Sequence, residues 1–237
     1  MSGRLSDAGD GAGALAAIRE AVDIYHRLAR ENTARFAPDL ADSLNNLSLR
    51  LSDAGDGASA LAAVREAVDI YRRLARDNPA RFALDLAMSL NNMSNALSDS
   101  RDSRGALAVI REAVEIRRGL ARDNPARFAP DLAASLNNLS LRLGDAGDGE
   151  AALAAIGESV DRYRSLVRAN PARFAPDLAA SLNNLSIRLS HAGDSAAALT
   201  AIREAVEIRR QLAQDTPARF ALALQRSLRI LEVLEKG

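Results

Sequence analysis

The chain has 237 residues, of which 48% are hydrophobic and 26% are charged, with 31 basic against 31 acidic side chains. This composition is typical of a folded protein and excludes a disordered polyelectrolyte. A net charge of zero argues against a dedicated nucleic-acid binder, and the absence of Cys excludes disulfides and thiolate chemistry.

The five Phe residues indicate an internal repeat. They lie at positions 36, 82, 128, 174 and 220, each 46 residues after the one before. A fixed period of this size predicts an array of copied units. We expect one domain over 1–237, with a partial first repeat at 1–33, full repeats at 34–79, 80–125, 126–171 and 172–217, and a capping helix at 218–237.

The N-terminal residues are expected to begin inside a repeat. Residues 1–9 match residues 47–55 in phase, so the chain should open halfway through one helix and turn at Gly9. A second helix should follow to about residue 31, with one face bare because it lacks a full partner. We therefore expect a fragment of a longer array, or a homo-oligomer contact over this bare N-terminal face.

Each full unit predicts two helices. Apolar residues of the first helix recur at helical steps, at Leu40, Leu44, Leu47 and Leu51. We expect this helix to begin at Asp39, to end at a left-handed Gly55 and to be followed by a cap at Asp56. The second helix should span about 57–76, with its apolar stripe at Ala60, Val64, Ala67, Val68, Tyr71 and Leu74.

The link between units is expected to be a short connector. Pro79 stops the second helix because it cannot continue it, and Phe82 is the large apolar anchor of the connector Ala80–Ala83. Five Arg residues, at 35, 81, 127, 173 and 219, are expected to pair with Asp39, Asp85, Asp131 and Asp177.

An all-α fold follows from these patterns, because neither helix shows the two-residue alternation of a strand. One helix pair cannot bury its apolar face alone, so successive pairs must stack into a right-handed α-solenoid of antiparallel helix pairs. Small residues at one repeat phase mark the close approaches, at Ala60, Ala106, Ala152 and Ala198.

The order Leu44, Leu47, Ser48, Leu51, Gly55, Ala60, Val64, Ala67 resembles the tetratricopeptide repeat (TPR). The unit is longer than the usual 34 residues, and with Leu-Asn-Asn-Leu in its first helix it is similar to the kinesin-light-chain-type subgroup. The resemblance implies that the first helices line a concave surface that binds protein or peptide partners.

An Asn pair in each first helix is the candidate functional feature. The pairs are Asn45 and Asn46, Asn91 and Asn92, Asn137 and Asn138, and Asn183 and Asn184. An Asn amide offers a donor and an acceptor, so a ladder of them could hold an extended backbone. Side-chain preference would come from neighbours at one repeat phase, namely Leu49, Asn95, Leu141 and Ile187.

The same Asn residues could instead form a packing ladder between neighbouring first helices, and the sequence leaves both interpretations open. We expect a non-enzymatic, cytoplasmic scaffold that binds a protein or an extended peptide. The alternative is a structural or self-associating module, or part of the sensor array of a larger signalling protein. We expect no catalytic residues, cofactor, metal, nucleic acid or membrane as partners.

Overall fold

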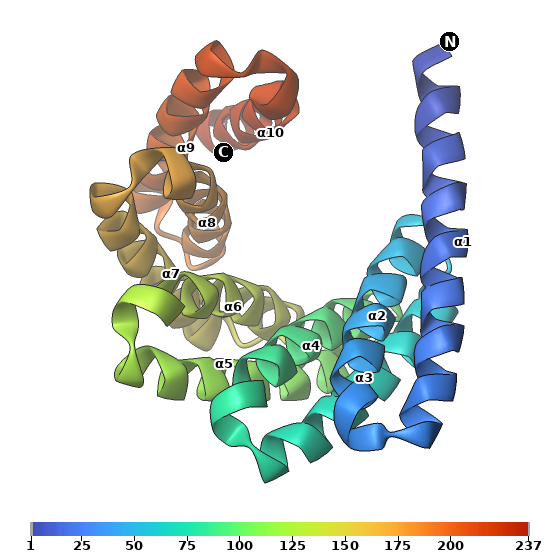
Figure 1. Ribbon diagram of the computed structural model, residues 1–237. Coiled ribbons are helices and arrows are strands. Elements are labelled where there is room, and N and C mark those ends of the chain that lie inside the picture. The colour runs from blue at the N-terminus through green and yellow to red at the C-terminus, as the bar shows by residue number, and fades with distance from the viewer. Residues whose placement is uncertain (1, 237) are drawn as a thin grey trace. The chain divides into compact units, whose positions relative to one another are not determined.

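The computed structural model describes residues 2–236, and the side chains of residues 13–236. Helices and short turns make up the whole of this part of the chain (Figure 1). The ten helices are α1 (Ser2–Glu31), α2 (Thr33–Asp53), α3 (Gly57–Asp77), α4 (Pro79–Asp99), α5 (Ser103–Asp123), α6 (Pro125–Asp145), α7 (Gly149–Ala169), α8 (Pro171–His191), α9 (Ser195–Asp215) and α10 (Pro217–Lys236). The all-α prediction is confirmed.

The chain divides into two compact units, residues 1–116 and 117–237, and each is described by itself. We name the even-numbered helices A and the odd-numbered helices B. From α1 to α4 and from α6 to α10 each helix packs against the next one in the chain, and A helices also contact A helices, as α2 does α4 and α6 does α8. The predicted stacking of helix pairs is confirmed. The repeat boundaries and the capping role of 218–237 stay predictions.

Each A helix begins earlier than the sequence predicted. Asn78 ends α3 and also caps α4, because its side chain accepts a hydrogen bond from the backbone N–H of Arg81. Pro79 then occupies the first turn, where its missing N–H costs nothing. The residues expected to form a connector, Ala80–Ala83, are therefore the first turn of α4, and the later Pro130 lies inside α6.

The turns from A to B helices follow the prediction. Gly55, Gly147 and Gly193 take positive φ angles of 80°, 82° and 85°. Asp56 caps α3 by accepting a hydrogen bond from the N–H of Ser59, which lowers its pKa. At the same phase Arg101 replaces glycine and is held at a φ of 64°, a conformation that strains residues with a Cβ.

The expected turn at Gly9 is not formed, because α1 runs without interruption from Ser2 to Glu31. The A-helix segment before Gly9 would have about two turns, too few to hold a packed partner in place. The side chains of 1–12 lie outside the described residues. The expected bare N-terminal face falls partly on them.

The core lies between the A and B helices. The small residues Ala60, Ala106, Ala152 and Ala198 are fully buried, as their phase predicted. A second row of buried aliphatic side chains follows four residues later, at Val64, Ile110, Ile156 and Ile202. Burying a side chain of this size contributes about 1.5 to 3 kcal/mol. None of the described helices is both long and apolar enough to cross a lipid bilayer.

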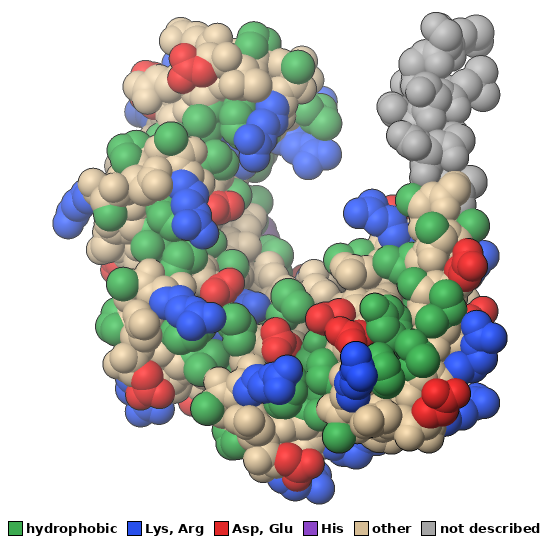
Figure 2. All heavy atoms as spheres, in the orientation of Figure 1, with side chains coloured by type: hydrophobic (Ala, Val, Ile, Leu, Met, Phe, Trp, Pro, Cys, Tyr) green, Lys and Arg blue, Asp and Glu red, His purple; other side chains and the backbone are tan. Residues whose placement is uncertain are grey.

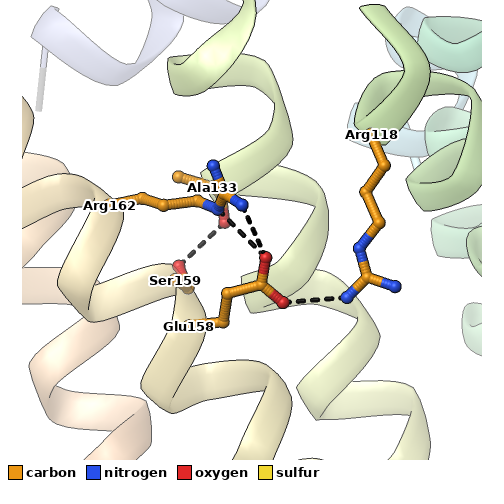
Figure 3. Close-up of polar contacts among 5 residues, drawn as sticks. All are labelled: Arg118, Ala133, Glu158, Ser159 and Arg162. Carbon is orange, nitrogen blue, oxygen red and sulfur yellow. Dashed lines mark hydrogen bonds and ion pairs between the residues drawn. The ribbon is translucent and has the colours of Figure 1, made fainter. Parts of the chain in front are cut away.

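Neighbouring B helices are linked by ion pairs between residues 40 positions apart. Within residues 1–116, Arg72 meets Glu112 at 2.7 Å. Within residues 117–237, Glu158 accepts hydrogen bonds from Arg118 of the preceding B helix at 2.8 Å and from Arg162 of its own helix, as Figure 3 shows. The same figure shows Ser159 donating to the carbonyl oxygen of Ala133 at 2.8 Å. Side chains thus join the B helices one repeat to the next.

Candidate functional site

The first Asn of a pair is buried between A helices at Asn45 and Asn183, whereas Asn91 and Asn137 are half-buried. In the N-terminal unit Asn45 is 3% exposed, and its Nδ2 donates to Oγ of Ser89 in α4 at 2.7 Å. In the C-terminal unit Asn183 is 7% exposed, and its Oδ1 accepts a hydrogen bond from Oγ of Ser227 in α10 at 3.0 Å. Asn45 and Asn183 are therefore not open to a ligand, in contrast to the expected groove. The neighbouring A helix covers their side of the helix.

The second Asn of a pair lies nearer the surface. Asn46 is exposed, and Asn92, Asn138 and Asn184 are half-buried. Asn184 donates from Nδ2 to Oδ1 of Asn137, in the preceding A helix, at 2.9 Å. An Asn amide has two donor hydrogens and an acceptor oxygen, so this bond leaves Asn184 able to make others. In α2 and α8 the first Asn of the pair therefore packs against a neighbouring A helix, and the second lies nearer to solvent.

The apolar neighbours differ in exposure. Leu49 is 45% exposed, Leu141 and Ile187 are half-buried, and the polar Asn95 of the same row is exposed. The structure adds Val233 of α10, which lies 46 residues after Ile187 and is 65% exposed. The sequence analysis missed it although the repeat phase alone would have found it.

A cleft joins two members of this apolar row. Ile187 of α8 and Val233 of α10 line a cavity of about 310 Å³. Its other lining residues are Ser190, His191, Arg229, Ile230 and Leu234. The apolar row therefore borders an open volume in the C-terminal unit that could receive an apolar side chain.

Four buried serines of the A helices lie 46 residues apart, at Ser89, Ser135, Ser181 and Ser227. The sequence pattern had not indicated a role for them. Ser227 donates to Asn183 and accepts a hydrogen bond from Arg209 of α9 at 2.5 Å. The same Arg209 also donates to the carbonyl oxygen of Ala223 at 2.9 Å. Burial lowers the pKa of Arg209 because the charged form loses solvation.

The position of Arg209 in the repeat is taken by Tyr or Arg in the B helices. Tyr71, Arg117, Tyr163 and Arg209 are all buried. Tyr71 donates to Oδ1 of Asp42 at 2.5 Å, and burial together with this carboxylate raises the pKa of Tyr71. Either residue type spans from the B helix to an A helix, so the position is structural.

Among the described residues, no ion pair joins the connector Arg residues to the predicted Asp partners. Burial raises the pKa of Asp85 and of Asp177, whereas the charges of Arg81 and Arg173 act to lower it. Among the described side chains, Arg35, Arg81, Arg127, Arg173 and Arg219 each place the guanidinium over the ring of the following Phe, at 4.8 to 5.0 Å from its centroid. This is cation–π geometry. Figure 2 shows acidic and basic side chains intermixed over the visible surface of each unit.

Four segments match the family model of the tetratricopeptide repeat, at residues 40–80, 86–126, 132–171 and 178–217. No curated protein matches the chain. Solved structures that share the fold include the three described next. BtubC (BKLC) from P. vanneervenii has a TM-score of 0.71 and 19% identity, over 94% of this chain and 82% of that one.

A putative kinesin light chain of Podosopora anserina, with nearly identical TPR-like repeats, has a TM-score of 0.62 and 17% identity over 90% of this chain and 92% of that one. MamA has a TM-score of 0.52 and 14% identity over 89% of this chain and 95% of that one. At these identities the likeness concerns the fold alone.

Proposed function

Because the chain belongs to the tetratricopeptide repeat family, with kinesin-light-chain-like arrays among its structural neighbours, we propose that it binds a protein or an extended peptide segment. Repeats of this family typically serve as scaffolds for protein interactions. We place the binding surface on the face of the A helices that points away from the B helices. We expect this face to be concave. The proposed role is non-catalytic and cytoplasmic.

The single observation that carries this proposal is the apolar row on an otherwise polar face. Leu49 of the N-terminal unit has the same place in its repeat as Leu141, Ile187 and Val233 of the C-terminal unit. Leu49 and Val233 are strongly exposed. Asn46, Asn92, Asn138 and Asn184 flank this row, and Asn95 occupies it in α4. The amides would bond to the backbone of the partner while the apolar side chains select its residues.

The expected affinity is modest. A hydrogen bond contributes about 0.5 to 1.5 kcal/mol net, whereas micromolar binding needs about 8 kcal/mol. Four amides therefore supply part of the binding free energy, and apolar contacts must supply much of the remainder. This balance favours a weak and replaceable partner over a tight one.

The test uses peptides selected from a random library by the folded protein. We expect Leu49→Ser and Val233→Ser to weaken binding of the selected peptides by about tenfold each, because each loses about 1.5 kcal/mol of apolar burial. Changing Asn46, Asn138 and Asn184 together to Ala should weaken it further. Fluorescence anisotropy with a labelled peptide measures these affinities.

The matched control is Ile24→Ser, which removes an exposed apolar side chain from the B helix α1. It should leave peptide affinity unchanged. Thermal melts identify variants that lose stability. If the A-helix variants melt like the parent chain and bind every selected peptide as well as it does, the proposed surface is wrong.

The second candidate is a structural or self-associating module, or part of the sensor array of a larger signalling protein. The exposed Ile24 of α1, 38% accessible, favours it because a second copy could cover this side chain. Self-association would use the B-helix surface of α1 and leave the A-helix face free. The two candidates therefore predict different effects of the same substitutions.

A further inference from the structure

One arginine in the C-terminal unit differs from its repeat equivalents. Arg50, Arg142 and Arg188 share one phase of the A helices. Arg50 pairs with Asp53 at 3.1 Å, and Arg142 pairs with Asp145 at 3.2 Å. Three residues after Arg188 the chain has His191 in place of the Asp. Among the described residues, no ion pair or hydrogen bond joins the side chain of Arg188, and its Nε is buried without a partner.

A glycine fixes the place of this guanidinium. Ser52, Ser98 and Ser190 share one phase, and the fourth member of that row is Gly144. A Cβ on Gly144 would lie 1.9 Å from Nη1 of Arg188 and 2.4 Å from its Cζ. The guanidinium therefore occupies the space that a side chain at 144 would fill. Two departures from the repeat therefore act on Arg188. Gly144 leaves the space that its guanidinium fills, and His191 replaces the Asp that would pair with it.

The guanidinium of Arg188 and Gly144 border a cavity. A volume of about 480 Å³ is lined by Gly144, Gly147, Gly149, Glu150, Leu153, Arg188, His191 and Ala192. Glu150 is the only carboxylate in this lining, and it forms no ion pair with Arg188 within the described part of the chain. His191 also lines the neighbouring cleft with Ile187 and Val233. The cavity thus borders the apolar row of the A helices.

We propose that this cavity binds a single carboxylate group of the partner, held by the forked N–H donors of Arg188. A planar guanidinium matches a carboxylate in geometry, because its N–H donors lie in pairs that can bond to both carboxylate oxygens. Glu150 in the lining disfavours a doubly charged group such as phosphate. The proposal rests on the proposed function, and it names a carboxylate beside an apolar side chain as the feature recognised.

The probe is a short peptide, N-acetyl-Leu-Asp-amide, with N-acetyl-Leu-Asn-amide as its uncharged counterpart. Amide chemical shifts of Gly144, Gly147 and Gly149 are followed by NMR during titration of each peptide. We expect the Asp peptide to shift these signals in a saturable way, with millimolar affinity. The Asn peptide should bind at least about tenfold more weakly, because it lacks the charge that strengthens the hydrogen bonds.

Two substitutions at one position provide the matched pair. His191→Asp restores the partner seen at Asp53 and Asp145, so it should weaken binding of the Asp peptide by about tenfold or more. His191→Asn introduces a side chain of similar size without charge, so binding should persist. Gly144→Ser installs the residue of the other repeats, and it should displace Arg188 and also weaken binding.

Three results would overturn the carboxylate site: equal binding of the two peptides, equal binding by the two His191 variants, or tighter binding of inorganic phosphate than of the Asp peptide. The probe is too short to span the Asn residues. Retained binding by the Asn46, Asn138 and Asn184 variant therefore reports on this site alone. Conversely, the A-helix face could still bind selected peptides if the carboxylate site fails.

Discussion

Single hydroxyl groups link the polar rows of this protein. Ser89 accepts a hydrogen bond from Asn45 and donates to the carbonyl oxygen of Asp85, and Ser227 similarly joins Arg209 to Asn183. A hydroxyl both donates and accepts, so a buried Ser can satisfy two polar neighbours at once. The Asn residues at these positions hold A helices together, and the alternative of a packing ladder therefore applies to Asn45 and Asn183 and to the bond between Asn137 and Asn184.

At the same scale, Glu158 provides a test by pH. Burial alone would raise its pKa, but hydrogen bonds from Arg162 and Arg118 outweigh burial and hold the pKa below its ordinary value of 4.5. The folded state therefore binds fewer protons than the unfolded state in this range. The stabilisation is present above about pH 4.5 and is lost as pH falls through the lower folded pKa.

We expect Glu158→Gln to lower the free energy of unfolding by about 1 kcal/mol at pH 7, since the carboxylate is partly exposed. The difference from the parent chain should shrink as the pH falls through the folded pKa, where the native carboxyl is protonated too. Urea unfolding at a series of pH values measures both. A constant difference from pH 7 to pH 3 would contradict the assignment.

At the scale of the helices, caps and turns decide where each element begins. Asn78 shows that one residue can end a B helix and cap the next A helix, so the two are separated by a single residue. The A-to-B turn instead needs a residue with positive φ, which is Gly in three repeats. Arg101 takes that conformation in the remaining repeat, and the strain there is local.

Arg101→Gly should therefore stabilise the chain. A left-handed conformation costs a residue with a Cβ about 1 to 2 kcal/mol, and glycine avoids this cost. Glycine also makes the unfolded chain more flexible, which offsets about 0.5 to 1 kcal/mol of the gain. We expect a net gain of about 0.5 to 1 kcal/mol, seen as a higher Tm.

Gly147→Ala is the reverse experiment, because a Cβ there meets no atom within 4 Å and only the backbone is strained. It should lower the Tm by a similar amount. If Arg101→Gly lowers the Tm instead, the side chain of Arg101 contributes contacts that outweigh its backbone strain.

At the scale of the whole molecule, the two proposed roles predict different masses in solution. A scaffold that binds peptides through its A helices should have the mass of one chain at all concentrations from about 1 to 100 µM, a range that brackets micromolar affinity. Light scattering coupled to size exclusion measures this. A mass that rises with concentration in the parent chain, and returns to one chain in Ile24→Ser, would favour the self-associating module.

The sequence by itself determined the repeat, the two helices of each unit, the left-handed glycines and the small residues at the close approaches. These follow from local periodicity and from turn chemistry, which act within one unit. The sequence also determines the start of each A helix, through a cap such as Asn78 and a first-turn proline such as Pro79, but Pro79 alone was interpreted, and only as the end of the preceding helix.

Only the tertiary structure decided which amide of each pair is covered. Adjacent Asn residues differ by 100° around a helix, and in α2 and α8 the neighbouring A helix covers Asn45 and Asn183 and leaves Asn46 and Asn184 nearer to solvent. In the same way, the position of the Arg188 guanidinium depends on Gly144, which is 44 positions earlier in the sequence but packs directly beneath it. Contacts between repeats decide such features, because no pattern within one unit records what its neighbour places against it.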